Sequence, residues 1–420
     1  MKKIALHWQI LIGMGLGVLF AFVLVQFSWG KQLIIDWIKP FGNIFINLLK
    51  LIAVPLILGS LIKGVSDLKD ISKLSKMGGR TIGLYILTTV LAVSIGLVVV
   101  NIIKPGEFIS KETRTELLAN FAGDANDRIE AANKQNEVGP LQALEDIVPS
   151  NIFLAATDNG SMLQVIFFAL FFGVSMILVP EKTAKPVKEF FDSFNDIILK
   201  MIDVIMLAAP IGVFALLASL VAESPSIDLF KALGMYGISV LIGLALVMCV
   251  YLLMVKLFAK KSPSYFLNGM APAQLLAFST SSSAATLPVT MERVVDHLGV
   301  DEEVASFVLP IGATINMDGT SLYQAVAAVF IAQAFGMDLT LGAQLGIIVT
   351  ATLASIGSAA VPGAGMVMLV IVLAQAGIPE AGLALIFAID RPLDMCRTTI
   401  NVTGDAAVAM VVAKSVDKLE

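Results

Sequence analysis

The sequence predicts an all-α, polytopic membrane protein, and three observations lead to this fold class. Hydrophobic residues make up 57% of the 420 residues and charged residues only 15%, whereas a soluble domain carries about 25% charged residues. Apolar runs of about 20 residues, long enough to cross a bilayer, recur along the chain. The runs are continuous, whereas the strands of a membrane barrel would alternate polar and apolar residues, so they indicate helices.

Six continuous apolar runs precede the last part of the chain, and each is interpreted as one membrane span. The first run follows MKKIALHW. It is too long for the core of a signal peptide and lacks a small-residue cleavage site, which favours a retained helix. The runs are 8–28, 41–63, 82–103, 161–179, 202–222 and 232–258.

Lysine and arginine orient the chain, because they are enriched in the cytoplasmic loops of membrane proteins. They gather before the first run and after the second, fourth and sixth runs, and the loops between are poorer in them. We therefore expect cytoplasmic N- and C-termini, an extracellular polar loop 104–148 and a location in the plasma membrane. The basic residues are Lys2, Lys3, Lys69, Lys73, Lys76, Arg80, Lys182, Lys185, Lys188, Lys256, Lys260 and Lys261.

The apolar segments after the sixth run are interrupted. The stretch 263–295 contains STSSSAATLP and the stretch 343–375 contains GSAAVPGAG, and neither suits one continuous helix. Each is long enough for a hairpin of two half-helices, and each precedes a helix with polar residues, 302–333 and 380–413. Because the two hairpins start from opposite sides, the pattern predicts inverted repeats around a midplane site, a plan found in transporters. Two ordinary kinked spans are the alternative.

The helix 380–413 carries a polar face in the sequence DRPLDMCRTTINVTGD. Asp390, Asp394, Arg397, Asn401 and Asp405 fall within an arc of about 80° at 100° per residue. Each charge near the bilayer centre costs roughly 2.5–3.5 kcal/mol, so this face is expected to avoid lipid. It indicates a substrate or ion path, with a set of internal ion pairs such as Asp394–Arg397 as the alternative.

The helix 302–333 contains TINMDGTS, with Asn316, Asp318 and Thr320 next to Gly312 and Gly319. The glycines permit local unwinding, which exposes backbone carbonyls, and oxygen ligands are what a hard cation prefers. A kinked helix with a capped break explains this motif equally well.

The run 82–103 contains YILTT, with Thr88 and Thr89 after Tyr85. The two hydroxyls could join an ion site, although bonding to their own helix backbone is the favoured interpretation from these residues alone.

Four motifs, STSSSAATLP, NMDGT, GSAAVPGAG and DMCRTTINVTGD, occur in this order and spacing. In this the whole chain resembles the sodium-coupled dicarboxylate and amino-acid symporter family, which includes the excitatory amino-acid transporters and archaeal aspartate transporters. The resemblance implies an elevator-type transporter, a homotrimer in membrane lipid, with eight transmembrane helices and two re-entrant hairpins per protomer. It implies scaffold helices in 1–77 and 149–222, a transport helix in 78–103, the extracellular loop 104–148 and a transport core in 223–420.

By the same resemblance, Arg397 would bind the side-chain carboxylate of an acidic amino acid, with help from Thr320. Asp394 would hold its amino group and Asn401 its α-carboxylate. The substrate set is Arg397, Asp394, Asn401, Thr398, Thr320, Ser282, Ser283, Val361 and Gly365.

The resemblance also implies three sites for co-transported Na⁺. The first consists of Gly312, Asn316, Asn401 and Asp405. The second, beneath the tip of the second hairpin, consists of Thr314, Met317, Ser355, Ile356 and Ser358. The third consists of Tyr85, Thr88, Thr89, Asn316 and Asp318.

The chain departs from the family pattern at two places. Many members carry a further arginine where this chain has Ser281 or Met395, and Arg391, one turn before Met395, is a candidate replacement. The proton-carrying glutamate of the mammalian relatives corresponds to Gln324, which cannot titrate, so sodium is favoured over protons.

Other functional classes fit these residues less well. An intramembrane hydrolase could use Ser281–Ser283, but His7 and His297 lie at span ends and no Gly-x-Ser-x-Gly motif is present. A buried Asp–Arg set suits ligand capture better than channel conduction. Two cysteines and a net charge of −5 without a basic block indicate neither a disulfide framework nor a nucleic-acid partner.

We therefore predict no enzyme but a sodium-coupled symporter of aspartate or glutamate. A proton-coupled or C4-dicarboxylate carrier is the alternative, although a plain dicarboxylate does not need Asp394 and a neutral amino acid does not need Arg397.

Overall fold

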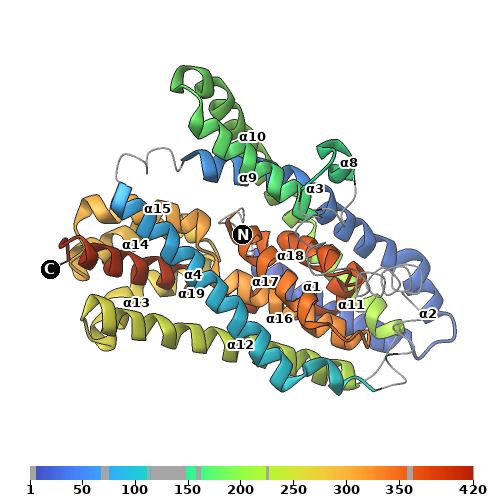
Figure 1. Ribbon diagram of the computed structural model, residues 1–420. Coiled ribbons are helices and arrows are strands. Elements are labelled where there is room, and N and C mark those ends of the chain that lie inside the picture. Colours follow the sequence, from blue (N-terminus) through green and yellow to red (C-terminus); the bar gives the residue numbers. More distant parts are fainter. Residues whose placement is uncertain are drawn as a thin grey trace, which may run out of the picture.

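The computed structural model describes residues 6–67, 75–110, 114, 148–157, 162–223, 227–356 and 363–419. This part of the chain is almost entirely helical (Figure 1) and contains no β-strand, only an isolated bridge between Val300 and Leu419. The expected all-α class is confirmed.

The longer helices follow one another along the chain, and the described residues contain three π-helical segments and two 3-10 turns between them. The α-helices are α1 (Leu6–Leu24), α2 (Gly30–Leu33), α3 (Lys39–Asp67), α4 (Ser75–Ile103), α8 (Ile152–Thr157), α9 (Met162–Leu178), α10 (Glu181–Leu207), α11 (Ala209–Glu223), α12 (Ile227–Met254), α13 (Pro263–Thr280), α14 (Ser283–Glu292), α15 (Glu302–Ile315), α16 (Asp318–Ala334), α17 (Leu341–Ile356), α18 (Ala364–Gln375) and α19 (Leu383–Ser415). The π-helical segments are Ile34–Ile38, Val255–Ala259 and Arg293–His297, and the 3-10 turns are Pro105–Phe108 and Glu380–Gly382.

Three continuous helical stretches in the described residues are long and apolar enough to cross a membrane: Gly30–Ser66, Met77–Phe108 and Asp228–Ala259. They contain the runs 41–63, 82–103 and 232–258. The first exceeds the expected 41–63 because α2 and a π-helical segment precede α3 without a break. The runs 8–28 and 161–179 correspond to the shorter helices α1 and α9.

The run 202–222, expected as one continuous helix, is broken in the structure. Helix α10 ends at Leu207, and α11 begins at Ala209 after a bend of 52°. Pro210 lies in the first turn of α11. A proline suits this position, because it has no N–H to donate to the preceding turn and so favours a new helix start over a continued one.

The interrupted segments form pairs of helices, as expected. In 263–295, α13 ends at Thr280 and is followed by Ser281, which has a left-handed backbone (φ 52°). Ser282 caps α14 by accepting a hydrogen bond from the N–H of Ala285. Helices α13 and α14 pack together, and so do α17 and α18. The second tip, residues 357–362, lies outside the described residues.

The predicted helix 302–333 consists of two helices. It breaks at Asn316 and Met317, whose backbones are not helical, and α16 begins at Asp318. The predicted unwinding is therefore present, and it lies between the two flanking glycines, Gly312 and Gly319.

The helices pack in two groups. Helix α3 packs against α9, α10 and α11, and α1 packs against α11; in Figure 1, α9 and α10 lie beside part of α3. The second group surrounds α16, which contacts α4, α12, α17, α18 and α19 and is almost wholly buried. The groups meet where α18 contacts α3 and where α19 contacts α11.

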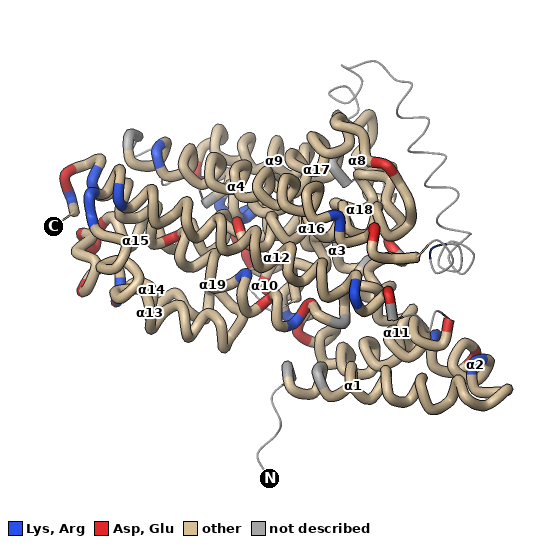
Figure 2. Tube along the Cα trace, turned by 90° about the horizontal axis from the view of Figure 1, so that it is seen from below, with Lys and Arg blue, Asp and Glu red and all other residues tan. Residues whose placement is uncertain are grey.

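Charge follows the expectation for a chain in a bilayer. Figure 2 shows long uncharged stretches of helix, with charged residues near the C-terminus, at the opposite end around α2 and α8, and some between the two ends. Large apolar side chains such as Leu87, Ile102 and Ile238 are exposed on helix surfaces, which suits contact with lipid.

Candidate functional site

The polar face predicted on α19 is turned into the protein. Asp390, Asp394, Arg397, Asn401 and Asp405 are each at most 8% exposed. Their helix packs against α12, α13, α15 and α16, so the face meets protein and not lipid. Burial of this many polar groups requires that they be paired.

Arg397 lies at the centre of this face and is fully buried. Its Nη2 atom lies 2.7 Å from Asp394 Oδ1 and its Nη1 atom 3.1 Å from Asp390 Oδ1. The centre of the guanidinium lies 3.7 Å from the centre of the Tyr323 ring, within cation–π distance. The internal pair that the sequence left as an alternative is thus present. A ligand carboxylate could bind one of the two terminal nitrogens of the guanidinium in place of Asp390 or Asp394.

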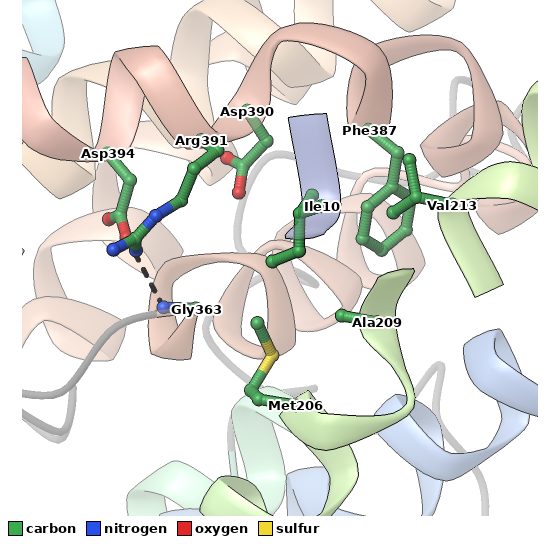
Figure 3. Close-up of a pocket in the computed structure, with 9 residues that line it drawn as sticks. All are labelled: Ile10, Met206, Ala209, Val213, Gly363, Phe387, Asp390, Arg391 and Asp394. Carbon is green, nitrogen blue, oxygen red and sulfur yellow. Dashed lines mark hydrogen bonds and ion pairs between the residues drawn. The ribbon is translucent and has the colours of Figure 1, made fainter. Parts of the chain in front are cut away.

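The second oxygen of Asp394 connects two helices. Asp394 Oδ2 accepts a hydrogen bond from Arg391 Nη1 at 3.1 Å and another from the Gly363 N–H at 3.3 Å. Figure 3 shows this contact between α19 and the residue that precedes α18. Arg391 therefore lies at the site, as suggested for the departure from the family pattern, and bonds the same carboxylate as Arg397.

A cavity of about 20 Å³, room for roughly one water molecule, lies beside these groups (Figure 3). Charged residues of α19 line one side of it and apolar residues of α1, α10 and α11 line the other. The lining residues are Ile10, Met206, Ala209, Val213, Gly363, Phe387, Asp390, Arg391 and Asp394.

Asn401 joins α19 to the start of α16. Its Oδ1 atom accepts a hydrogen bond from the Gly319 N–H at 2.8 Å, and its Nδ2 atom donates to Thr320 Oγ1 at 3.2 Å. A Cβ at Gly365 would lie 3.0 Å from Thr320 Cγ2 and 3.6 Å from Arg397 Nη2. The structure thus brings Arg397, Thr320, Asn401 and Gly365 together, with α18 in close approach.

Of the remaining substrate candidates, the structure describes Thr398, Ser282 and Ser283. Thr398 is buried and donates to the Asp394 carbonyl at 2.9 Å. Ser282 and Ser283 are buried at the start of α14, which packs against α19. Val361 lies outside the described residues.

The first expected sodium set gathers at Asp405. Asn316 Nδ2 donates to Asp405 Oδ1 at 2.9 Å. A Cβ at Gly312 would lie 2.5 Å from the same Asp405 oxygen and 2.4 Å from the Tyr85 hydroxyl, so only glycine leaves room for these oxygens. Asn401, one turn before Asp405 on α19, points to Gly319 and Thr320 instead.

The third set gathers at Asp318. Thr89 Oγ1 donates to Asp318 Oδ1 at 2.6 Å, and Thr88 Oγ1 lies 3.4 Å from Asn316 Oδ1. Both hydroxyls also lie within 3.1 Å of the Tyr85 carbonyl of their own helix. The two interpretations of YILTT are therefore compatible.

The second set is gathered only in part. Ser355 Oγ accepts a hydrogen bond from the Met317 N–H at 3.1 Å and donates to the Ile315 carbonyl at 3.2 Å. Ile356 ends α17 beside it. Thr314 is exposed, and its hydroxyl donates to carbonyls of its own helix, so this side chain does not join the group. Ser358 lies outside the described residues.

Two buried tyrosines at these sites were missed by sequence reasoning. Tyr323 lies under Arg397, and its spacing of three residues from Thr320 on α16 was a signal that could have found it. Tyr251 donates to Asp318 Oδ2 at 2.6 Å. It lies within an apolar run on α12, where no local pattern marks it.

The candidate ligands in these sets are hydroxyl, amide, carboxylate and backbone oxygens. Within the described ranges, no three His, Cys, Asp or Glu side chains come together as a metal cluster. All-oxygen sets of low charge suit a hard cation and not a transition metal.

Comparisons with known proteins identify the family to which the chain is similar. Residues 6–415 match the family described as the sodium:dicarboxylate symporter family. The chain is 35% identical to a proton/sodium-glutamate symport protein of Geobacillus stearothermophilus, over 99% of this chain and 95% of the relative. It is 32% identical to a proton/glutamate-aspartate symporter of Escherichia coli, over 98% and 93%. It is 38% identical to excitatory amino acid transporter 3 of Mus musculus, over 89% and 78%.

Proposed function

Because the chain belongs to the sodium:dicarboxylate symporter family, we propose that it is a secondary active symporter that takes up aspartate or glutamate together with sodium ions. The observation that carries this function is Arg397, fully buried between Asp390 and Asp394 in the packed interior. The guanidinium of Arg397 is planar, always charged and rich in donors, so it suits a carboxylate. The neighbouring carboxylate of Asp394 only accepts hydrogen bonds, so it suits an ammonium group. A ligand with both groups is an acidic amino acid.

Binding then proceeds by exchange of ion pairs. The side-chain carboxylate of the substrate replaces Asp394 on Arg397, with Thr320 as a further donor. The substrate ammonium takes the Asp394 Oδ1 atom that Arg397 releases, while Arg391 and the Gly363 N–H keep Oδ2 in place. Asn401 binds the α-carboxylate through its amide N–H groups. The helix ends near Ser282 and Gly363 add backbone N–H groups that favour an anion.

Sodium is co-transported cargo in this proposal. Asp405 with Asn316 and the oxygens near Gly312 would take one ion, and Asp318 with Thr88, Thr89 and the Tyr85 carbonyl another. The region of Ser355 and Met317 at the end of α17 would take a third. Asn316 lies in two of these sets and is joined to Asp405. Asn401 bonds Gly319 and Thr320, so ion and substrate sites share the α15–α16 break, which supports coupling.

The proposal includes the architecture expected from the sequence: eight spans, two re-entrant hairpins and a homotrimer in the plasma membrane with cytoplasmic termini. The paired helices α13–α14 and α17–α18, and the exposed apolar side chains, support it. The packing of α1, α3, α9, α10 and α11 into one group, which meets the helices around α16 through α18 and α19, supports a scaffold and a transport part. In this scheme the transport part carries substrate and ions across by an elevator motion.

Proton coupling is the second candidate, because the names of two bacterial relatives include protons. Gln324 is buried beside Gly365, where its Nε2 atom lies 3.4 Å from the carbonyl oxygen, and it cannot carry a proton. A plain C4-dicarboxylate would leave Asp394 without a cationic partner from the ligand. Sodium-coupled transport of an acidic amino acid therefore remains the favoured function.

The test is uptake into liposomes containing the purified protein. Radiolabelled aspartate, glutamate and succinate are offered under sodium, proton and potassium gradients imposed separately. We expect sodium-driven uptake of an acidic amino acid. With three sodium ions and one monoanionic substrate, two net charges would enter, so 100 mV would add roughly 4.6 kcal/mol. Uptake driven by a pH gradient without sodium, or uptake of succinate alone, would refute the proposal.

A further inference from the structure

Tyr251 is a fully buried tyrosine on α12 that contacts the Asp318 carboxylate on the side away from the candidate ion set. Its hydroxyl donates to Asp318 Oδ2 at 2.6 Å. A Cβ at Gly404 of α19 would lie 2.6 Å from this hydroxyl and 3.0 Å from Asn316 Nδ2. The Tyr251 phenol therefore occupies a space between α12, α19 and the start of α16. Gly404 leaves that space open because it has no side chain.

The two oxygens of Asp318 have different surroundings. Oδ1 accepts from Thr89, next to Thr88 and the Asn316 amide. These oxygens form the candidate ion set. Oδ2 accepts from Tyr251, which comes from a different helix. The phenol can therefore hold the carboxylate without occupying the position that a cation would take between Asp318 Oδ1 and the neighbouring oxygens.

We infer that Tyr251 is a positioning residue for sodium binding at Asp318, acting through its hydrogen bond to Oδ2. This inference rests on the proposed function and deepens it, because it assigns to α12 a part in ion selectivity and affinity. A hydrogen bond from a neutral donor stabilises a buried carboxylate in its charged form and fixes its rotation. A carboxylate held in this way presents Oδ1 to the cation without an ordering cost at the time of binding.

Tyr251→Phe tests the inference, because it removes one hydroxyl and keeps the ring. The sodium concentration for half-maximal uptake is measured at saturating substrate, and the substrate concentration for half-maximal uptake at saturating sodium. We expect the sodium value to rise about tenfold, the usual size for a lost hydrogen bond to a charged group, and the substrate value at saturating sodium to stay within about twofold.

Tyr236→Phe is the matched control. Tyr236 lies on the same helix roughly four turns earlier, is equally buried, and stacks on Phe330 with 4.8 Å between ring centres. The same loss of a buried hydroxyl there should leave the sodium value unchanged.

A second variant guards against misfolding of Tyr251→Phe. Gly404→Ala places a methyl group on the Tyr251 hydroxyl and should also raise the sodium value. Sodium-induced thermal shift of the purified proteins gives the affinity without transport.

The outcomes separate the inference from the function on which it rests. Absence of sodium dependence in the wild-type protein would overturn the proposed function. An unchanged sodium value in Tyr251→Phe, or an equal change in Tyr236→Phe, would overturn the role of Tyr251 while sodium coupling stands.

Discussion

Arg397→Cys is the substitution that tests the substrate site most directly. The change removes the only arginine among the described residues that forms ion pairs with both Asp390 and Asp394. Cysteine is much smaller and uncharged, so the partner of the substrate's side-chain carboxylate is lost while Asp394 and Asn401 remain.

The expected loss follows from two opposing features of the structure. Removal of one partner of a buried charge pair typically costs about 2–5 kcal/mol, and the full burial of Arg397 favours the upper part of that range. The substrate must, however, displace Asp394 from Arg397, which reduces the net contribution of the arginine. We therefore expect a loss of about 3 kcal/mol, or roughly 150-fold in affinity for aspartate and glutamate.

The same substitution should create a new specificity. The space that the guanidinium leaves can accept a small neutral side chain, and Asp394 and Asn401 can still bind the ammonium and α-carboxylate. Serine, alanine or cysteine should thus be bound by Arg397→Cys in place of the acidic substrates.

The assay is substrate-induced thermal shift, followed by uptake with both classes of amino acid. Because the variant leaves Asp390 without its arginine, the free energy of unfolding should fall, by about 3–5 kcal/mol in comparable buried pairs. Size-exclusion chromatography therefore checks folding first, and Arg397→Lys, which keeps the charge but not the fork, should give an intermediate affinity. Unchanged aspartate affinity in folded Arg397→Cys would refute the reasoning.

Three further predictions concern the neighbouring groups. Asp394→Ser should weaken binding of every amino acid roughly 30-fold or more and spare succinate relatively; equal losses for both in thermal-shift titrations would contradict the ammonium role. Asp405→Asn keeps the shape of the side chain but removes its charge, so the sodium concentration for half-maximal uptake should rise by about tenfold or more, and an unchanged sodium titration would exclude Asp405 from the ion site. Gly363→Ala forces a methyl group onto a left-handed backbone (φ 83°) at 2.8 Å from Met206 Sδ, which costs about 1–2 kcal/mol and disturbs the N–H bonded to Asp394. Its substrate affinity should fall several-fold, whereas the control Gly346→Ala, with open space around it, should bind as the wild type does; equal affinities would show that Gly363 is not needed.

Much of the fold was predictable because the signals are local. The length and continuity of the apolar runs predicted helices, and the 3.6-residue period of α19 predicted that Asp390 and Asp405 share one buried face. The glycines around NMDGT predicted a break between α15 and α16. The bend after Leu207 was missed, because the apolar run hides the start of a new helix at Pro210.

The sequence predicted which residues form the candidate site better than it predicted how they contact one another. The resemblance to a known family supplied Arg397, Asp394 and Asn401, and the structure places them together. It also shows two contacts that helical spacing permits but does not by itself specify: Asp390 pairs with Arg397 Nη1, and Arg391 bonds the second oxygen of Asp394. Thr314, expected at an ion site, turns its hydroxyl to its own helix.

The sequence by itself determined which helix faces are polar, since neighbours along a helix are set by its period. Only the tertiary structure decided what those faces meet. Tyr251 and Thr89 reach Asp318 from helices far away in the chain, and their partnership depends on how α4, α12 and α16 pack. A buried carboxylate must find donors from whichever helices lie beside it, and that choice is made by packing of whole helices, not by any short stretch of sequence.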